Sequence, residues 1–456
     1  MKKIYTIIIG LALSITAWSQ PNYSLNTYSA KTGKKASYYN NEANRFIKRG
    51  YYNEAVLNAA HALKLSNKKR GLSEAQERLN DSYNLAIQEN LERINILKEK
   101  NTSFNGDQTV TEMAEIVRIY TTMHNYNTIL SSISPKSFKA AKKRDTGLHL
   151  DINNYKDDLK AAKEAFEKSK YDAANMHFNR GIELSKLTDR QSNKEAARLF
   201  KWSTMYVKNF KDSNTRYETS KNLGTTRMGI IAFENSYQAR SYGDLGSMTT
   251  ENLIGKLLQR TQLEFFQLIS RDQLNLILQE QQLNLSGMMD ETSTVEVGQL
   301  KGVHVLLVGK INTATTDRQS LQPQTFTLEE KVSNGKEKYK DKDGIEKERT
   351  SYKTVHADVD IFTKTAQASS SGSFKIVDVE TGTIIKAGTI NGDYKWEHQW
   401  ARYKGDERAL SSEYKTLVNK TDTPFPLNSI LIQNAIENLT INLSNEIKAY
   451  ANQVGH

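Results

Sequence analysis

The chain has 456 residues, is 38% hydrophobic and 25% charged, and carries a formal net charge of +11. These values are typical of a globular protein of the water-soluble type with two or three domains. They exclude a chain built of membrane-spanning helices. Cysteine is absent, which excludes disulfides, thiolate catalysis and cysteine-ligated metals.

The first nineteen residues have the pattern of a secretory signal peptide. Lys2 and Lys3 precede an uncharged apolar run that ends at Trp18, and Ala17 and Ser19 are small residues where a signal peptidase reads the chain. We expect a signal peptide over 1–19, a linker over 20–36 and an exported mature protein. Loss of the two lysines lowers the net charge to +9. For a protein outside the cytoplasm, a positive net charge favours lipid, polysaccharide or acidic-protein partners over nucleic acid.

Residues 37–215 carry a helical pattern nearly throughout, and two segments within it look alike. Residues 43–55 and 162–174 both combine small alanines, a Gly or Ser at an expected turn, and a tyrosine, Tyr51 or Tyr171. Both are tetratricopeptide-like, but their separation far exceeds the ~34 residues of a continuous array. We therefore expect degenerate helical hairpins, either packed without a ligand or forming a peptide- or protein-binding groove.

A second domain, 224–456, is predicted to be of the α/β type. The pattern predicts, in chain order, a strand over 228–233, a helix over 248–262, strands over 263–269 and 303–311, a hairpin of 372–379 with 383–388, and a closing helix over 427–450. The predicted fold class is thus α+β multidomain, with helical hairpins followed by an α/β domain.

Two neighbouring segments of this domain carry a family resemblance. Arg271 to Gly287 places Leu274, Ile277, Leu278 and Leu285 on one helical stripe, and Gly298 to Lys310 reads as a short helix followed by an apolar strand. Both segments resemble the CsgG family, the curli production assembly/transport component. The resemblance implies an outer-membrane location and a role in export of extracellular fibre subunits. Many members begin with an acylated cysteine, whereas Gln20 cannot be acylated in that way.

The resemblance also implies two insertions, at about 312–371 and 390–426. In CsgG-type channels the corresponding β-hairpins of several subunits line one transmembrane channel. The candidate membrane-strand residues alternate with polar ones and are Val355, Ala357, Val359, Ile361, Tyr394, Trp396 and Trp400. Charges crowd residues 329–353, and 406–418 looks more helical than stranded. Two solvated hairpins on a water-soluble protein remain the alternative.

The loop after the first strand of this domain corresponds to the narrow constriction of family channels. Asn235, Tyr237 and Tyr242 are the residues whose amide and aromatic side chains fit that part, which requires a symmetric oligomer. An ordinary strand-to-helix loop with exposed tyrosines explains the same residues.

Catalytic patterns are missing from the sequence. The eight histidines are scattered, no pair has metal-ligand spacing, and no nucleotide-binding or hydrolase motif is present. His356 with Asp358 and Asp360 is the closest polar constellation, and a lumen- or solvent-facing strand accounts for it. We predict a protein that is not an enzyme and needs no cofactor and no metal.

These patterns together predict a periplasmic or outer-membrane component for secretion and assembly of curli-like fibres or adhesins. We expect a homo-oligomeric CsgG-like export channel that acts passively on a secreted protein substrate, with an accessory envelope protein as a further partner. The alternative is a soluble periplasmic scaffold or activator that binds another envelope protein.

Overall fold

The computed structural model describes residues 23–141, 147–258, 263–269 and 302–455. The chain divides into two compact units, Met1–Gly224 and Thr225–His456, each with a core of its own. The first is helical and the second contains a mixed sheet, which confirms the predicted order of helical and α/β parts. The signal peptide over 1–19 and the helix expected at 271–287 lie outside the described residues.

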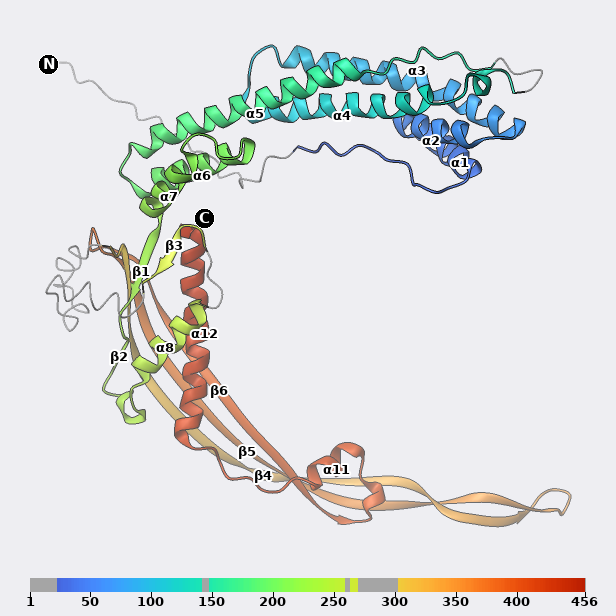
Figure 1. Cartoon of the computed structure of the whole chain (residues 1–456). Coiled ribbons are helices and arrows are strands. Elements are labelled where there is room, and N and C mark those ends of the chain that lie inside the picture. The colour runs from blue at the N-terminus through green and yellow to red at the C-terminus, as the bar shows by residue number, and fades with distance from the viewer. Residues whose placement is uncertain (1–22, 142–146, 259–262, 270–301, 456) are drawn as a thin grey trace, which may run out of the picture. The chain divides into compact units, whose positions relative to one another are not determined.

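The helical unit consists of helices of different lengths, with short connections except for the long segment between α4 and α5 (Figure 1). Its described elements are α1 (Ala36–Ile47), α2 (Tyr52–Leu65), α3 (Lys69–Lys100), α4 (Gly106–Ser131), the 3₁₀ turn η1 (Pro135–Phe138), α5 (Lys156–Ser185), α6 (Arg190–Tyr206) and α7 (Ser213–Gly224). Large side chains such as Leu79, Tyr83, Tyr126 and Phe200 fill its core.

The first tetratricopeptide-like segment forms a tight helical hairpin. Gly50 lies in the turn between α1 and α2 with a φ of 73°, a left-handed value that glycine adopts without strain. Ala43 of α1 and Ala59 of α2 are fully buried, and such small residues let the two helices approach closely. The likeness of this pair to tetratricopeptide repeats stays a prediction.

The second similar segment is not a hairpin, which corrects the prediction. Residues 162–174 lie within the uninterrupted α5, so the chain does not turn at Ser169. The Ser169 hydroxyl instead donates a hydrogen bond of 2.7 Å to the Phe166 carbonyl within the helix. Because neither glycine nor proline breaks the segment, helix continues through Lys170 and Tyr171.

A partly buried polar cluster joins α4, α5 and α6 in this unit. His177 Nε2 lies 2.7 Å from Asp107 Oδ1, and the Tyr206 hydroxyl donates to the same oxygen at 2.8 Å. Burial alone raises the pKa of Asp107, but these hydrogen bonds and the charge of His177 outweigh it, so the pKa lies below its ordinary value. The carboxylate therefore favours the folded helices in its ionised form.

The α/β unit is one twisted sheet with helices against it (Figure 1). Its strands are β1 (Thr226–Ile230), β2 (Glu234–Asn235), β3 (Phe266–Leu268), β4 (Val305–Lys340), β5 (Glu346–Asp378) and β6 (Ile384–Gly405), and its helical elements are η2 (Arg240–Tyr242), α8 (Leu245–Leu258), η5 (Glu407–Ala409), α11 (Ser412–Val418) and α12 (Asn428–Gly455). The strand order is β3-β1-β4-β5-β6, with β2 paired to β4. β1, β2 and β3 join in parallel, while β5 and β6 continue antiparallel.

The core of this unit lies between the sheet and the helices α8 and α12. Along α12, the apolar residues Leu431, Ala435, Ile436, Leu439, Leu443 and Ile447 are fully buried. Their helical spacing places them on one face, which packs on β6 and β5 (Figure 1). Gly392 of β6 lies directly under this helix, and its missing side chain permits the close contact.

The hairpin predicted at 372–388 is present as the turn between β5 and β6. Asp378 N donates to Thr383 O at 2.9 Å, and Gly382 takes a φ of 69° in the turn. The Asp378 carboxylate accepts from Glu380 N and Thr381 N, which fixes the turn from inside.

Candidate functional site

The predicted constriction loop runs from β2 to α8 and is tightly held by Asn235. The Asn235 amide donates to Gly243 O at 3.0 Å, and its oxygen accepts from Gly246 N at 2.8 Å. Gly246 lies in the first turn of α8, so Asn235 satisfies a helix N-terminus. These bonds occupy the amide side chain within its own loop.

The two tyrosines of this loop have different surroundings. Tyr237 is 90% exposed and extends from the loop into solvent. Tyr242, in contrast, is partly buried against the core of the α/β unit. Of the three predicted residues, Tyr237 is therefore the side chain that is free to meet another molecule.

The predicted first insertion is a continuous extension of β4 and β5. The two strands stay paired from Val305 with Asp378 out to Lys340 with Glu346, with register shifts near Thr313, Leu321 and Ser333. β6 accompanies β5 only as far as the pair of Gly405 with Ala357. Beyond that pair the described chain forms a two-stranded ribbon, which Figure 1 shows extending away from the sheet.

The predicted second insertion is not a hairpin. β6 is followed by η5, α11 and an extended segment that leads to α12, so no returning strand pairs with it among the described residues. The helical interpretation of 406–418 agrees with η5 and α11. Asp406 accepts from Arg408 N and from the Arg408 guanidinium, and these contacts hold the pKa of Asp406 far below its ordinary value.

The first group of candidate membrane-strand residues is covered by this segment. Val355, Ala357 and Val359 are at most 6% exposed, and Ile361 is partly buried with them. Their cover comes from the apolar residues Ala409, Leu410, Tyr414, Leu417 and Val418. This cover was not predicted from the sequence, although residues 414, 417 and 418 have the spacing of one helix face.

The second group lies under the extended segment before α12. Trp396, His398 and Trp400 stack along β6 with ring centroids 5.6–5.9 Å apart, and Phe362 of β5 stacks on Trp400 at 5.3 Å. Phe425 packs against Trp396, and His398 Nε2 donates to Thr421 O at 2.8 Å. Tyr394 is partly buried against the core. These aromatics thus have partners within the chain.

The buried side of β5 changes along its length. Val355, Ala357 and Val359 are buried at odd positions, whereas Ala366 and Ala368 are buried at even ones. No register shift between β5 and β6 separates the two sets, so they point to opposite faces. The segment from η5 to α12 therefore contacts one face with α11 and the other with Thr421–Phe425.

The ribbon tip is held by pairs of opposite charge across its strands. Glu337 pairs with Arg349, Lys336 with Glu348, and Lys338 with Glu346. Their side chains are 44–74% exposed, and exposed pairs of this kind contribute about 0–1 kcal/mol each. The charged tip is thus a solvated structure.

The described residues carry neither a metal-site nor a membrane-helix signature. Within the described ranges, no group of three or more His, Asp or Glu is placed to hold a metal ion. In the same ranges, no helix combines the length and the apolar character that crossing a bilayer requires. His356 lies 3.3 Å from Glu329 across the strands, an exposed pair on the ribbon.

The parallel part of the sheet and its loop carry the family signal. Residues 219–320 match the family model of CsgG, the curli production assembly/transport component. The match covers β1, β2, the loop with Tyr237, α8, β3 and the first part of β4. No curated protein matches the chain. The CsgG match thus covers the loop predicted to form a constriction and ends before the described ribbon tip, α11 and α12.

Proposed function

We propose that the protein is a component of a curli-type secretion and assembly system in the cell envelope. In this role several copies form an export channel at the outer membrane, and a secreted protein passes through it without nucleotide hydrolysis. Support comes from the CsgG match at 219–320, whose description is an assembly/transport component. The same unit carries the long β4–β5 ribbon.

The observation that carries this proposal is the unpaired edge of β4. β1 and β2 pair with β4 only up to Ile311, and from Asn312 to Lys340 its sole strand partner among the described residues is β5. An exposed strand edge of this length is a template for pairing with another chain. β6 forms the opposite edge, where the side-chain amides of Asn438 and Asn442 in α12 donate to the carbonyls of Asp393 and Asn391.

Pairing of these two edges joins copies head to tail. β4 and β6 are both antiparallel to β5, so they run parallel to each other, and β6 of one copy meets β4 of the next in parallel. A heterologous contact of this kind closes into a ring when the rotation between copies is suitable. In such a ring the exposed Tyr237 of each copy repeats around one axis.

A cysteine cross-linking experiment tests this arrangement, and the cysteine-free chain offers a clean background. Asp317 and Lys395 lie in one row across β4, β5 and β6. Their Cα atoms are two strand spacings apart, about 10 Å, whereas a disulfide spans at most about 7 Å. A bond between them therefore forms only between copies.

Three double variants cover the register of the contact: Asp317→Cys combined with Lys395→Cys, Glu397→Cys or Gln399→Cys. Oxidation of at least one variant in intact envelopes is expected to give a ladder of covalent oligomers, whereas each single cysteine stops at a dimer. If none of the three gives more than a dimer, head-to-tail pairing is refuted.

A second candidate function is a scaffold that binds another envelope protein. It is favoured by the burial of Val359 and Trp400 beneath other residues of the same chain, because apolar side chains that are already buried do not require contact with lipid. Removal of residues 319–363 separates the candidates. A channel loses its large detergent-extracted oligomer on this deletion, whereas a scaffold keeps its size. A variant in which only residues 334–351 are replaced by Asn-Gly is the matched control, because Ser333 and Tyr352 are paired.

A further inference from the structure

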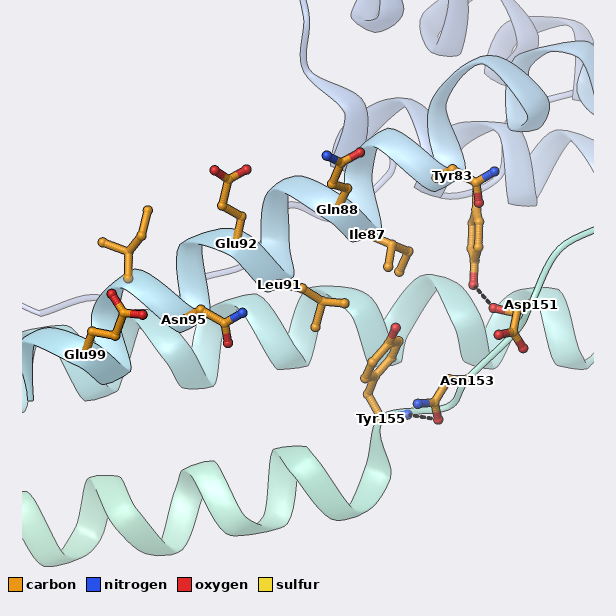
Figure 2. A pocket seen from close by; sticks show the side chains of 12 residues that line it. Tyr83, Ile87, Gln88, Leu91, Glu92, Asn95, Glu99, Asp151, Asn153 and Tyr155 are labelled. Carbon is orange, nitrogen blue, oxygen red and sulfur yellow. Dashed lines mark hydrogen bonds between the residues drawn. The ribbon is translucent and has the colours of Figure 1, made fainter. Parts of the chain in front are cut away.

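The helical unit contains a groove between α3 and the segment that leads into α5. It encloses about 870 Å³ and is lined by one face of α3 and by residues 151, 153 and 155 (Figure 2). Ile87 and Leu91 supply apolar surface, while Asn84, Gln88 and Asn95 supply amides along the helix. The groove therefore combines an apolar surface with side chains that both donate and accept hydrogen bonds.

Tyr155 is the most constrained residue of this groove. It is only 9% exposed, and Figure 2 shows its hydroxyl directed toward Leu91 and the interior of the groove. Its φ of 50° is left-handed, an uncommon and strained value for a large side chain. The hydroxyl makes no hydrogen bond among the described residues and faces the open groove, where it is available to a ligand.

The wall that presents Tyr155 is fixed by hydrogen bonds. Asn153 Oδ1 accepts from Tyr155 N at 3.3 Å, and Asn154 Oδ1 accepts from Lys156 N at 2.9 Å. On the α3 side, the Tyr83 hydroxyl donates to Asp151 O at 2.9 Å (Figure 2). A wall held in this way is ready for a ligand and needs little ordering when one binds.

The charge of the groove indicates the chemistry of its ligand. Glu92, Glu99 and Asp151 line it, and no lysine or arginine does. None of the three carboxylates has an ion-pair partner among the described residues. A cationic ligand gains from this arrangement, and an anionic one is repelled.

The length of the groove indicates a chain-like ligand. Asn84 and Glu99 lie fifteen residues apart on α3, which corresponds to about 22 Å along the helix axis. An extended polypeptide covers this distance with about seven residues. The amides of α3 can pair with its main-chain N–H and C=O groups, which lack partners in an extended chain.

We propose that this groove binds an extended, lysine- or arginine-rich segment of another protein. The carboxylates bind its basic side chains, Tyr155 and the amides bind its main chain, and Leu91 contacts an apolar side chain. This site stands independently of the proposed export function, because no residue of the α/β unit contributes to it.

Fluorescence anisotropy of the full chain with three labelled peptides tests the proposal. Each peptide has about ten residues, long enough to fill the groove. One alternates lysine with serine and leucine, the second replaces lysine by glutamate, and the third replaces it by glutamine. We expect the lysine peptide to bind at least about ten-fold more tightly than the other two at low salt. Equal binding of the three, or no binding of the lysine peptide, overturns the proposal.

Charge variants locate the site. Glu92→Gln/Glu99→Gln/Asp151→Asn is expected to weaken binding of the lysine peptide about ten-fold or more. Removal of three exposed carboxylates elsewhere in the unit, by Glu164→Gln/Glu183→Gln/Glu218→Gln, changes the net charge equally and is expected to leave binding unchanged. Equal losses in both triple variants refute the location, because they reveal a nonspecific charge effect.

Tyr155→Phe tests the hydroxyl separately. It keeps the ring and its packing, so we expect an unchanged circular dichroism melt and binding about five-fold weaker. Unchanged binding of the lysine peptide contradicts a role for this hydroxyl in holding the ligand.

Discussion

Gly392 offers a sharp test of how α12 is seated on the sheet. A Cβ atom added here would lie 2.1 Å from the Ala435 carbonyl oxygen and 2.3 Å from the Leu439 nitrogen. Both are backbone atoms of α12, so no side-chain rotation relieves the clash. Ordinary contact begins near 3.4 Å, and Gly392→Ala therefore forces the helix away from β6 by about 1 Å.

This displacement loosens the packing between α12 and β6 and so lowers the free energy of unfolding. Leu439 and Ala435 are fully buried at the contact, and overpacking of a core costs typically about 1–3 kcal/mol. We expect a loss near 3 kcal/mol, because the backbone cannot yield locally. With an m value of about 2–3 kcal/mol per M for a unit of this size, the urea midpoint falls by about 1 M. Trp396 and Trp400 report the transition by fluorescence, since both lie on β6.

Gly255→Ala is the matched control. Gly255 lies in α8, and the position that an added methyl group would take has no other atom within 4 Å. The same substitution is expected to stabilise this helix by about 0.5–1 kcal/mol. A Gly392→Ala protein with the urea midpoint of the parent refutes the close contact of α12 with β6.

Three further predictions concern charge and the loop. Burial and the charges of Arg198 and Arg190 lower the pKa of Lys194 to about 8. The unfolding free energy of the helical unit should therefore rise between about pH 8 and 10, where the unfolded chain still binds this proton. Urea titrations of Lys194→Met should lack this rise. The lowered pKa of Asp107 gives stability above about pH 4 that is lost as the pH falls through the pKa of Asp107 in the folded protein. Asp107→Asn should therefore lose less stability than the parent on acidification, as measured by circular dichroism. Asn235→Ala should lower the unfolding free energy by about 1 kcal/mol in urea, because the N-terminus of α8 loses the hydrogen bond of Gly246 N to Asn235. Tyr237→Ala should leave stability unchanged and reduce export of a reporter substrate. An equal loss of stability in both variants contradicts these separate roles of the two residues.

The parallel core of the α/β unit was accessible to sequence reasoning because its signals are local. Leu306 and Leu307 belong to an apolar run and are buried in β4, as such runs usually are in strands covered on both faces. The closing helix was equally visible, since its apolar residues recur with helical spacing along α12.

The extent of the ribbon was not predictable in the same way. The strand residues from Arg318 to Lys340 are mostly polar and exposed, without a two-residue alternation. Their strand state depends on partners in β5 that lie up to 48 residues away, as in the pair of Arg318 with Ala366. Cross-strand charge pairs such as Glu337 with Arg349 become recognisable only once the register is known.

The candidate membrane residues show a similar limit. Alternation at Val355, Ala357 and Val359 correctly indicated one apolar face, but an apolar face alone does not specify its cover. Here α11 supplies that cover from a segment more than fifty residues further along the chain. Composition cannot distinguish a face that meets lipid from one that meets a helix.

The two-stranded end of the ribbon has a consequence for how the molecule opens. Past the pair of Ala357 with Gly405, the strands lose their third neighbour, and exposed ion pairs replace an apolar core. A lone β-ribbon is marginally stable in water. Its amide hydrogens should exchange with solvent well ahead of those beneath α12, so the tip can unfold and refold as a cooperative unit of its own while the rest of the sheet stays closed.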